Sequence, residues 1–433
     1  MSAQHLITDH LDLWTSAVTH KSGSGRSASG KNEKIELTGI KKLRELILEL
    51  AVRGKLVDHD PNDEPASVLL ERIAEEKARL VKEGKIKNPK RLPDIEGYER
   101  SYLTHENWVW VRFQDIANEI STGPFGSMIH KHDYVNGGVP LINPSHMVNG
   151  RIREDSSVSI PAPKAEELSS YKLDAGDIVM ARRGEVGRCA LVTEREADWL
   201  CGTGSFVLRF HTSISRRFIL MMFATDSVRR YLTGNSVGTT MTNLNHGILN
   251  KLPVALPPAN EQQRIVEKVD ELMALCDRLE KQVGDQLEAH EVLVDTLLDA
   301  LTRSSDATEL AENWERVAEH FDTLFTTGAS IDKLKKTILK LAVTGRLVPQ
   351  DPNDKPASML LDKIAEEKDR LVKEGKIKKP KEISAPKAAD IPFKIPKKWK
   401  WCRLESLTLH SESGWSPQCD NTPRSGDRWG VLK

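Results

Sequence analysis

The sequence predicts an α+β fold with three parts: a mixed α/β domain, a long coiled-coil-forming helix, and helical modules that occur twice. Three observations support this class. A stretch of about fifty residues returns without a gap later in the chain. Short apolar runs bounded by Gly, Asp and Asn fill the region after its first copy. An apolar spacing of alternating four and three residues follows them, which is typical of a coiled coil.

The duplicated stretch defines a helical module. Residues 40–90 align with residues 331–381, and about 36 of 51 positions are identical. The same offset relates "WVWVRF" to "WKWCRL". We therefore assign residues 40–107 and 331–398 to two copies of one module. Residues 1–39, with a helix-like start and a Gly/Ser linker, receive no function.

Each copy of the module is predicted to contain two helices. In the first copy, an apolar stripe marks the first helix, and Gly54 follows at the position of a left-handed C-terminal cap. Asn62 and Asp63 are the predicted N-caps of the second helix, and Gly84 ends it. "KIKNPKRLP" then forms a basic linker interrupted by prolines.

Residues 108–256 are predicted to form the mixed α/β domain. The runs "GGVPLIN", "KLDAGDIVMARRG", "VGRCALV" and "GSFVLRFH" are typical of short strands. "SRRFILMMFATDSVRRYLTG" has the length and spacing of one helix. About 149 residues is a usual size for one domain.

Residues 257–330 contain the predicted long helix and its connection to the second module copy. A helix over residues 260–303 would be roughly 65 Å long. That length exceeds what the core of one domain requires, so the helix separates other parts or pairs with another helix. The predicted pairing residues follow the four-three spacing: Ile265, Val269, Leu272, Cys276, Leu279 and Val283.

Composition bounds the class of protein. Apolar residues make up 39% and charged residues 29%, and the net charge is zero, so any DNA-binding surface must be local. No apolar run is long enough to span a membrane, and the N-terminus lacks the features of a signal peptide. The five cysteines are scattered, which favours reduced thiols in a cytoplasmic protein and predicts no structural metal site.

Catalytic motifs are missing from the sequence. A methyltransferase would need a glycine-rich cofactor loop and an Asn/Asp-Pro-Pro-aromatic tetrad, and the nearest strings, "GPFGS" and "NPSH", lack the rest of such a site. The phosphate-binding loop of a nucleotide-driven motor is also absent. We therefore predict no catalytic residues and no cofactor in this chain.

Two polar stretches in the α/β domain have the chemistry of DNA contacts. Arginine forks bind guanine or phosphate, asparagine reads adenine, and threonine holds phosphate. The candidates lie in "ARRGEVGRC" and "GTTMTNLNHG", with two weaker ones before them. They are Arg182, Arg183, Arg188, Thr239, Thr240, Asn243, Asn245, His246, Lys131 and Ser127.

These features together resemble the specificity subunit of a type I restriction–modification system, of the IB type. The residues that carry the resemblance are "LDAGDIVMARRGEVGRCALV", "GNSVGTTMTNLNHGILNKLPVALPP", the "LPVALPPANEQQRIVEKVDELMALCDRLE" block and the duplicated "DPND(E/K)PAS" module. The resemblance covers most of the chain after residue 40. It implies that residues 108–256 are a target-recognition domain that reads half of a split site on double-stranded DNA.

The resemblance also implies partners. Modification subunits would methylate adenine with S-adenosylmethionine, and restriction subunits would cut DNA with ATP and Mg. Residues 399–433 look like the truncated start of a second target-recognition domain, with "WGVLK" as an interrupted strand. A second copy of the chain is then a further expected partner, which would restore the symmetry of the complex and read an inverted repeat.

Two other functions are compatible with the residues alone. One is a coiled-coil scaffold that binds protein and no DNA. The other is a stand-alone DNA adenine methyltransferase, which the missing motifs disfavour. Sequence-selective, salt-dependent DNA binding would exclude the scaffold, and methyl transfer without partners would support the methyltransferase.

Overall fold

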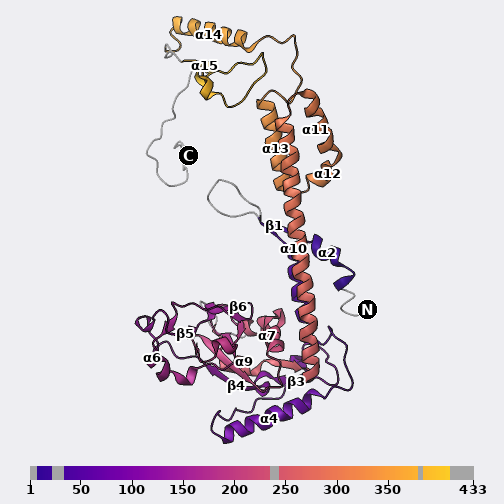
Figure 1. Cartoon of the computed structure of the whole chain (residues 1–433), viewed down its shortest axis with the longest axis vertical. Helices are drawn as coiled ribbons and strands as arrows, with labels where there is room; N and C mark the ends of the chain where they lie inside the picture. The colour runs from indigo at the N-terminus through magenta and orange to yellow at the C-terminus, as the bar shows by residue number, and fades with distance from the viewer. Residues whose placement is uncertain (1–6, 22–33, 235–242, 379–383, 410–433) are drawn as a thin grey trace, which may run out of the picture. The chain divides into compact units, whose positions relative to one another are not determined.

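The computed structural model of the chain describes residues 7–21, 34–234, 243–378 and 384–409. The chain forms two compact units, Met1–Asp285 and Gln286–Lys433. The Gly/Ser linker and the string "WGVLK" lie outside the described residues. The architecture has the predicted class, with a mixed α/β domain, a long helix and two similar helical modules (Figure 1).

The first module copy contains two amphipathic helices in the first unit. Their buried faces carry the predicted apolar stripe. Gly54 has the predicted left-handed backbone, with φ +64°, and Gly84, which was predicted to end the second helix, has φ +70°. Short elements before the module lead into its first helix. In chain order the segment contains α2 (Leu11–Ser16), β1 (Thr19–Lys21), β2 (Lys34–Glu36), α3 (Thr38–Val52), α4 (Ala66–Lys82) and η1 (Gly97–Glu99).

The α/β domain is built on an antiparallel sheet in the order β10-β9-β12-β4. A smaller sheet, β11-β5-β8, and the hairpin β6-β7 lie beside it, and β3 pairs with β13 to close the domain on itself. The strands are β3 (Val109–Arg112), β4 (Ala117–Thr122), β5 (Val139–Ile142), β6 (Met147–Val148), β7 (Arg151–Ile152), β8 (Ser159–Ile160), β9 (Ile178–Ala181), β10 (Cys189–Leu191), β11 (Leu200–Cys201), β12 (Ser205–Phe210) and β13 (Pro253–Leu256).

Helices cover this sheet and supply much of its core. Phe113 of α5, Phe206 of β12 and Phe223 of α7 are fully buried and belong to one apolar cluster with α3 and α10. The helices of the domain are α5 (Phe113–Ile116), η2 (Lys131–Asp133), η3 (Pro144–His146), α6 (Ala162–Glu167), η4 (Ser169–Tyr171), η5 (Glu194–Glu196), α7 (Arg216–Ala224), α8 (Asp226–Gly234) and α9 (His246–Lys251).

The predicted long helix is α10, Ala259–Arg303, whose 45 residues correspond to a length of about 67 Å. Its apolar residues form a stripe along an otherwise polar helix. Within the described ranges, every helix is too short or too polar to cross a membrane.

The second unit contains the end of α10, a connection and the second module copy. Val294, Leu298 and Leu301 of α10 pack with Leu334 and Leu341 of the second copy. Lys333 adds ion pairs to Glu291 and Asp295 of α10. The helices are α11 (Ala307–Glu319), α12 (Phe321–Leu324), α13 (Gly328–Val343), α14 (Ala357–Lys373), η6 (Ala388–Asp390) and α15 (Leu404–Leu407).

Two local predictions were wrong. Neither Asn62 nor Asp63 caps α4, because Pro65 occupies the N-cap position and Asp63 turns away to bind Arg264 of α10. The stretch after Ser215 is two helices instead of one. Thr225 adopts an extended backbone between α7 and α8, and its Oγ1 donates a hydrogen bond to Met222 O at 2.7 Å.

Candidate nucleic-acid interface

Several loops of the α/β domain converge at the end of strand β9. Arg182 N donates to Gly204 O in the turn before β12, and Leu244 N donates to Arg182 O, both at 2.9 Å. An isolated bridge joins Arg183 to Asn243. The structure thus brings together five of the predicted residues, which we call the interface cluster: Arg182, Arg183, Asn243, Asn245 and His246.

Two glycines allow these loops to approach so closely. A Cβ atom on Gly123 would lie 2.1 Å from Gly202 O, and one on Gly202 would lie 2.2 Å from Asn143 Oδ1. Backbone at such distances excludes any side chain at these positions. The ends of β4 and β5 are therefore held against the turn that carries the interface cluster.

Arg182 has a structural role within the cluster. Its Nε donates to Leu244 O at 3.2 Å, and its guanidinium lies over the Phe206 ring, 4.8 Å from the ring centroid. Burial, together with the neighbouring Arg183, lowers the pKa of Arg182. The side chain fastens the Leu244 loop to the sheet and stabilises the cluster.

Arg183 is the exposed cation of the cluster. Among the described residues its side chain has no ion-pair or hydrogen-bond partner. The backbone of Arg183 is nevertheless held by the bridge to Asn243. An exposed guanidinium on a fixed backbone is suited to bind a guanine edge or a phosphate.

The asparagines and the histidine differ in their availability. Asn245 Oδ1 caps helix α9 by accepting from Ile248 N at 3.0 Å. The His246 ring packs on Phe206, and its Nε2 lies 3.2 Å from Ile120 O. Burial of the ring lowers the pKa of His246, whereas the contact with Ile120 O opposes this change. Asn243 Oδ1 is buried and has no hydrogen-bond partner among the described residues.

The remaining predicted residues either do not belong to the interface cluster or lie outside the described residues. Arg188 belongs to the same turn as Arg182, but it pairs with Glu185 at 3.1 Å and lines a cleft of about 1000 Å³ beside α7 and α10. Ser127 and Lys131 are exposed on the loop that starts at Gly123. Thr239 and Thr240 lie outside the described residues.

Sequence reasoning missed two polar groups near the cluster. Asn143 Oδ1 and Ser205 Oγ are buried without a hydrogen-bond partner among the described residues. A buried orphan oxygen is costly, and such groups commonly bind water or a ligand. Asn143 directly follows strand β5 and precedes a proline. This position at the end of a strand is the feature of the sequence that could have identified it as a site residue.

The first module copy and Trp108, at the start of the α/β domain, both bind α10 through polar contacts. Trp108 Nε1 donates to Glu261 Oε2 of α10 at 3.0 Å, and His59 Nδ1 lies 2.7 Å from Glu261 Oε1. Burial raises the pKa of Glu261, whereas the Trp108 hydrogen bond and His59 oppose this rise. Arg264 binds Asp63 at 2.6 Å and holds the pKa of that carboxyl below its usual value.

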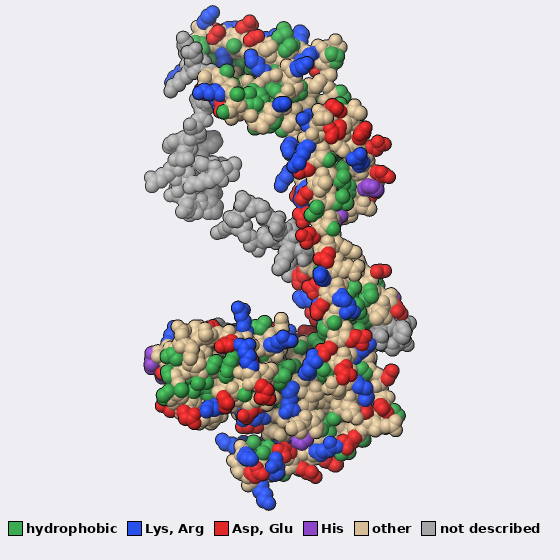
Figure 2. Space-filling model, viewed as in Figure 1, with side chains coloured by type: hydrophobic (Ala, Val, Ile, Leu, Met, Phe, Trp, Pro, Cys, Tyr) green, Lys and Arg blue, Asp and Glu red, His purple; other side chains and the backbone are tan. Residues whose placement is uncertain are grey.

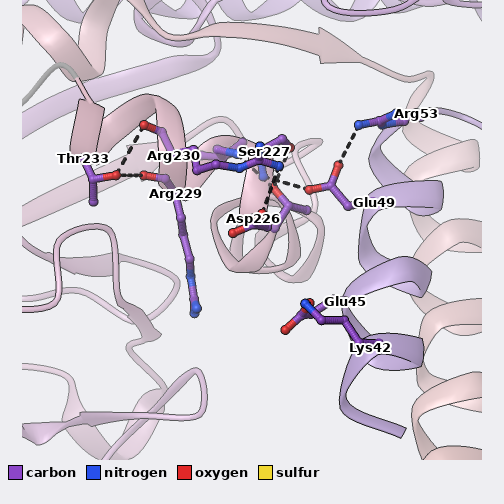
Figure 3. Close-up of polar contacts among 11 residues, drawn as sticks. Lys42, Glu45, Glu49, Arg53, Asp226, Ser227, Arg229, Arg230 and Thr233 are labelled. Carbon is purple, nitrogen blue, oxygen red and sulfur yellow. Dashed lines mark hydrogen bonds and ion pairs between the residues drawn. The ribbon is translucent and has the colours of Figure 1, made fainter. Parts of the chain in front are cut away.

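A second contact joins α3 to α8. Figure 3 shows Glu49 of α3 turned toward the start of α8, where Glu49 Oε1 accepts a hydrogen bond from Ser227 N at 2.8 Å. Arg53 binds the other oxygen of Glu49 at 3.2 Å. A carboxylate at a helix N-terminus satisfies a free backbone N–H and interacts favourably with the helix dipole.

The predicted pairing residues of α10 are all buried: Ile265, Val269, Leu272, Cys276, Leu279 and Val283. All except Val283 belong to the apolar cluster that includes Leu43 and Ile47 of α3. Arg44 of α3 supports this contact through Asp277 at 2.7 Å and Glu280 at 2.8 Å. The first half of the α10 stripe thus packs on a helix of the same chain.

No metal centre is found in the described ranges, where no group of three or more His, Cys, Asp or Glu residues could hold an ion. The chemistry of the interface cluster is that of hydrogen bonding and positive charge. It provides recognition groups for a polyanion and offers no nucleophile with an adjacent base.

Comparisons with known proteins agree with this chemistry. Residues 105–289 match the family described as Type I restriction modification DNA specificity domain. The chain is 43% identical over 428 residues to the type I restriction enzyme EcoAI specificity subunit of Escherichia coli, covering 94% of this chain and 68% of that protein. It is 42% identical over 461 residues to the Escherichia coli EcoEI specificity subunit, covering 100% of this chain and 72% of the relative.

A solved structure, of the HsdS subunit from Thermoanaerobacter tengcongensis, is similar with a TM-score of 0.31 and 16% identity, over 64% of this chain and 62% of that one. The assignment depends on the sequence matches, which span nearly the whole chain at more than 40% identity. The chain therefore belongs to the specificity subunits of type I restriction–modification systems, the non-catalytic components that recognise DNA sequence.

Proposed function

We propose that the α/β domain reads one half of a split DNA site through the interface cluster, with Arg183 and Asn243 as the base-contacting residues. The observation that carries this assignment is the exposed guanidinium of Arg183 on a backbone fixed by the bridge to Asn243. Arg182, Asn245 and His246 hold the loops in place through their own contacts.

The chemistry of the two residues fits the edges of DNA bases. Arginine donates two parallel hydrogen bonds to guanine, and asparagine both donates and accepts at adenine. The buried Oδ1 of Asn243 lacks a partner among the described residues, and a hydrogen bond from a bound base would satisfy it. Each such contact discriminates against a wrong base by about 1–3 kcal/mol.

The proposed complex includes other subunits. In this proposal, modification subunits methylate adenine with S-adenosylmethionine, and restriction subunits cut DNA with ATP and Mg. We place this activity in the cytoplasm, with the host DNA. The resemblance described above supports these partners, and the names of the relatives favour neither a DNA-free scaffold nor a stand-alone methyltransferase.

Mapping methylated adenines in a host that carries the chain tests the proposal and identifies the target site. A two-part motif is expected. An inverted repeat would support the pairing of two copies of the chain, whereas an asymmetric motif would contradict that pairing. A host genome without any two-part methylated motif would contradict the proposed function.

Arg183→Ala tests the base-contacting residue. Loss of a bidentate contact is expected to reduce the affinity ratio of target over scrambled duplex by about 5- to 150-fold, measured on the complex with modification subunits. Arg188→Ala is the matched control, since Arg188 lies on the same turn but pairs with Glu185. Equal selectivity of wild type and Arg183→Ala would refute the assignment.

A further inference from the structure

The basic linker, residues 85–93, is held along the α/β domain by its backbone. Gln114 Nε2 of α5 donates to Lys90 O at 2.8 Å. Lys77 of α4 donates in turn to Gln114 O at 2.6 Å, so that α4, α5 and the linker are tied together. Because backbone atoms make these contacts, the linker is ordered while its side chains point to solvent.

Most of the exposed side chains of the linker are cationic. Between Glu83 and Asp94 the sequence contains four basic residues and no acidic one: Lys85, Lys87, Lys90 and Arg91. Lys85 pairs with Glu83 at 2.8 Å. The other three have no ion-pair partner among the described residues. In a chain of zero net charge, an ordered and unneutralised basic strip is a local site for an anion.

The strip is connected to the interface cluster through Arg112 and helix α9. Arg112, which is buried, donates to Pro93 O at 3.1 Å and Asp94 O at 3.2 Å, at the end of the linker. The same guanidinium donates to Lys251 O, at the end of α9, at 2.9 Å. Helix α9 has six residues, about 9 Å, and its first turn is capped by Asn245 of the interface cluster.

We propose that the cations of the basic linker bind the DNA phosphate backbone next to the half-site. This inference depends on the proposed function for the position of the duplex. B-DNA carries one phosphate charge per about 1.7 Å of its axis, so a duplex on the interface cluster presents several phosphates over the length of α9. The contact is independent of sequence and adds affinity without selectivity.

The salt dependence of DNA binding measures these contacts. Each phosphate contact contributes about 0.9 to the slope of log K against log salt concentration. The triple variant Lys87→Ala, Lys90→Ala, Arg91→Ala is compared with wild type on a mixed-sequence duplex, with the full chain and a series of KCl concentrations. The slope is expected to become shallower by about 2–3, and circular dichroism checks that the variant is folded.

The second module copy supplies the control. Lys373 ends α14, and Lys376 and Lys378 follow it in the corresponding segment. Replacing all three by alanine removes the same charge. This variant is expected to keep the wild-type slope. Replacement of Lys87 and Lys90 by arginine is expected to keep it as well, because the charges remain.

Three results would overturn the proposal: an unchanged slope in the linker variant, an equal change in the control variant, or a wild-type chain without salt-dependent binding. Failure of the proposed function has a different signature. In that case Arg183→Ala leaves selectivity unchanged, whereas the linker variant still makes the slope of log K against log salt concentration shallower. Failure of the linker contact alone leaves the effect of Arg183→Ala intact.

Discussion

The duplicated module occurs twice in the structure, and its two copies share their local hydrogen bonds. Ala66 N donates to Asn107 O at 3.0 Å, and Ala357 N donates to Lys398 O at 2.8 Å, at equivalent positions. Gly345 adopts φ +71°, close to the +64° of its counterpart Gly54. Each of these glycines lies under a tryptophan ring. The local sequence thus determines the backbone of the module in both places.

The surroundings of the two copies differ. Trp108 is 4% exposed and Trp399 is 42% exposed, and Leu69 is 1% exposed against 59% for Leu360. Figure 2 shows hydrophobic side chains (green) on the surface of the second unit around α14 and α15. In the first copy, α10 and the α/β domain cover these positions.

Two residues that make long-range contacts in the first copy are replaced in the second. Glu49, which caps α8, corresponds to Lys340. His59, which faces Glu261, corresponds to Gln350, whose Nε2 donates to Gly345 O at 3.1 Å. Gln350 retains the contact to the local carbonyl and lacks the charge. The comparison separates residues that shape the module from residues that attach it to the recognition domain.

Replacing the tryptophans should give the largest difference between the copies. Trp108→Ala removes a buried ring and the donor to Glu261, and is expected to lower the free energy of unfolding by about 3–5 kcal/mol. Trp399→Ala is expected to cost less than about 1 kcal/mol, since its ring is half exposed. Urea unfolding followed by circular dichroism measures both. Equal costs would mean that the second copy is covered as well as the first.

Leucine replacements should give a smaller difference. Leu69→Ala leaves a cavity in a closed core and is expected to cost about 2–4 kcal/mol. Leu360→Ala is a surface change, expected to stay within about 0.5 kcal/mol. Thermal unfolding of the two variants side by side tests this. A melting temperature lowered equally by Leu360→Ala would contradict the exposed position of α14.

The aspartates should give the smallest difference, with a pH dependence. Arg264 holds the pKa of Asp63 below its ordinary value of 3.8. A carboxyl with a lowered folded pKa stabilises the fold above its unfolded pKa and loses this contribution as the pH falls through the folded value. Asp63→Asn is expected to cost about 1–3 kcal/mol at neutral pH.

The loss caused by Asp63→Asn is expected to shrink as the pH falls below about 4, the pKa of an unfolded aspartate, and to vanish below the lowered pKa of folded Asp63, where the wild-type carboxyl is protonated as well. Urea unfolding at a series of pH values measures it. Asp354→Asn, in the exposed second copy, is the matched control and should lie within about 0.5 kcal/mol at each pH. A pH-independent cost of Asp63→Asn would refute the role of the Arg264 ion pair.

Elements whose structure depends on residues close in the sequence could be predicted. The module helices, their terminal glycines, α10 and the strands β5, β9, β10 and β12 follow from periodicity and turn residues, whereas the other strands of the domain were not predicted. The wrong prediction for Asp63 shows the limit, because its partner Arg264 is 201 residues away and a local cap signal was present. The apolar stripe of α10 was visible, whereas α3 as the helix packed on it was not.

The interface cluster shows the same limit of prediction from sequence, here for individual side chains. Arg182, Arg183 and Arg188 look equivalent in one short turn, but the fold gives each a different role. Arg182 lies on the Phe206 ring, Arg183 is exposed, and Arg188 pairs with Glu185. Only the pairing of β9 with β12 and the return of the chain at Leu244 decide which side chain points outward.

The loops at the end of β9 are joined by main-chain hydrogen bonds, from Arg182 N to Gly204 O and from Leu244 N to Arg182 O. Such bonds do not depend on which side chains the loops carry. In the proposed interface, exchanging the outward-facing residues would therefore alter the preferred bases while the loop architecture persists. A few point substitutions would then be enough to create a new target site without a change in the scaffold that presents them.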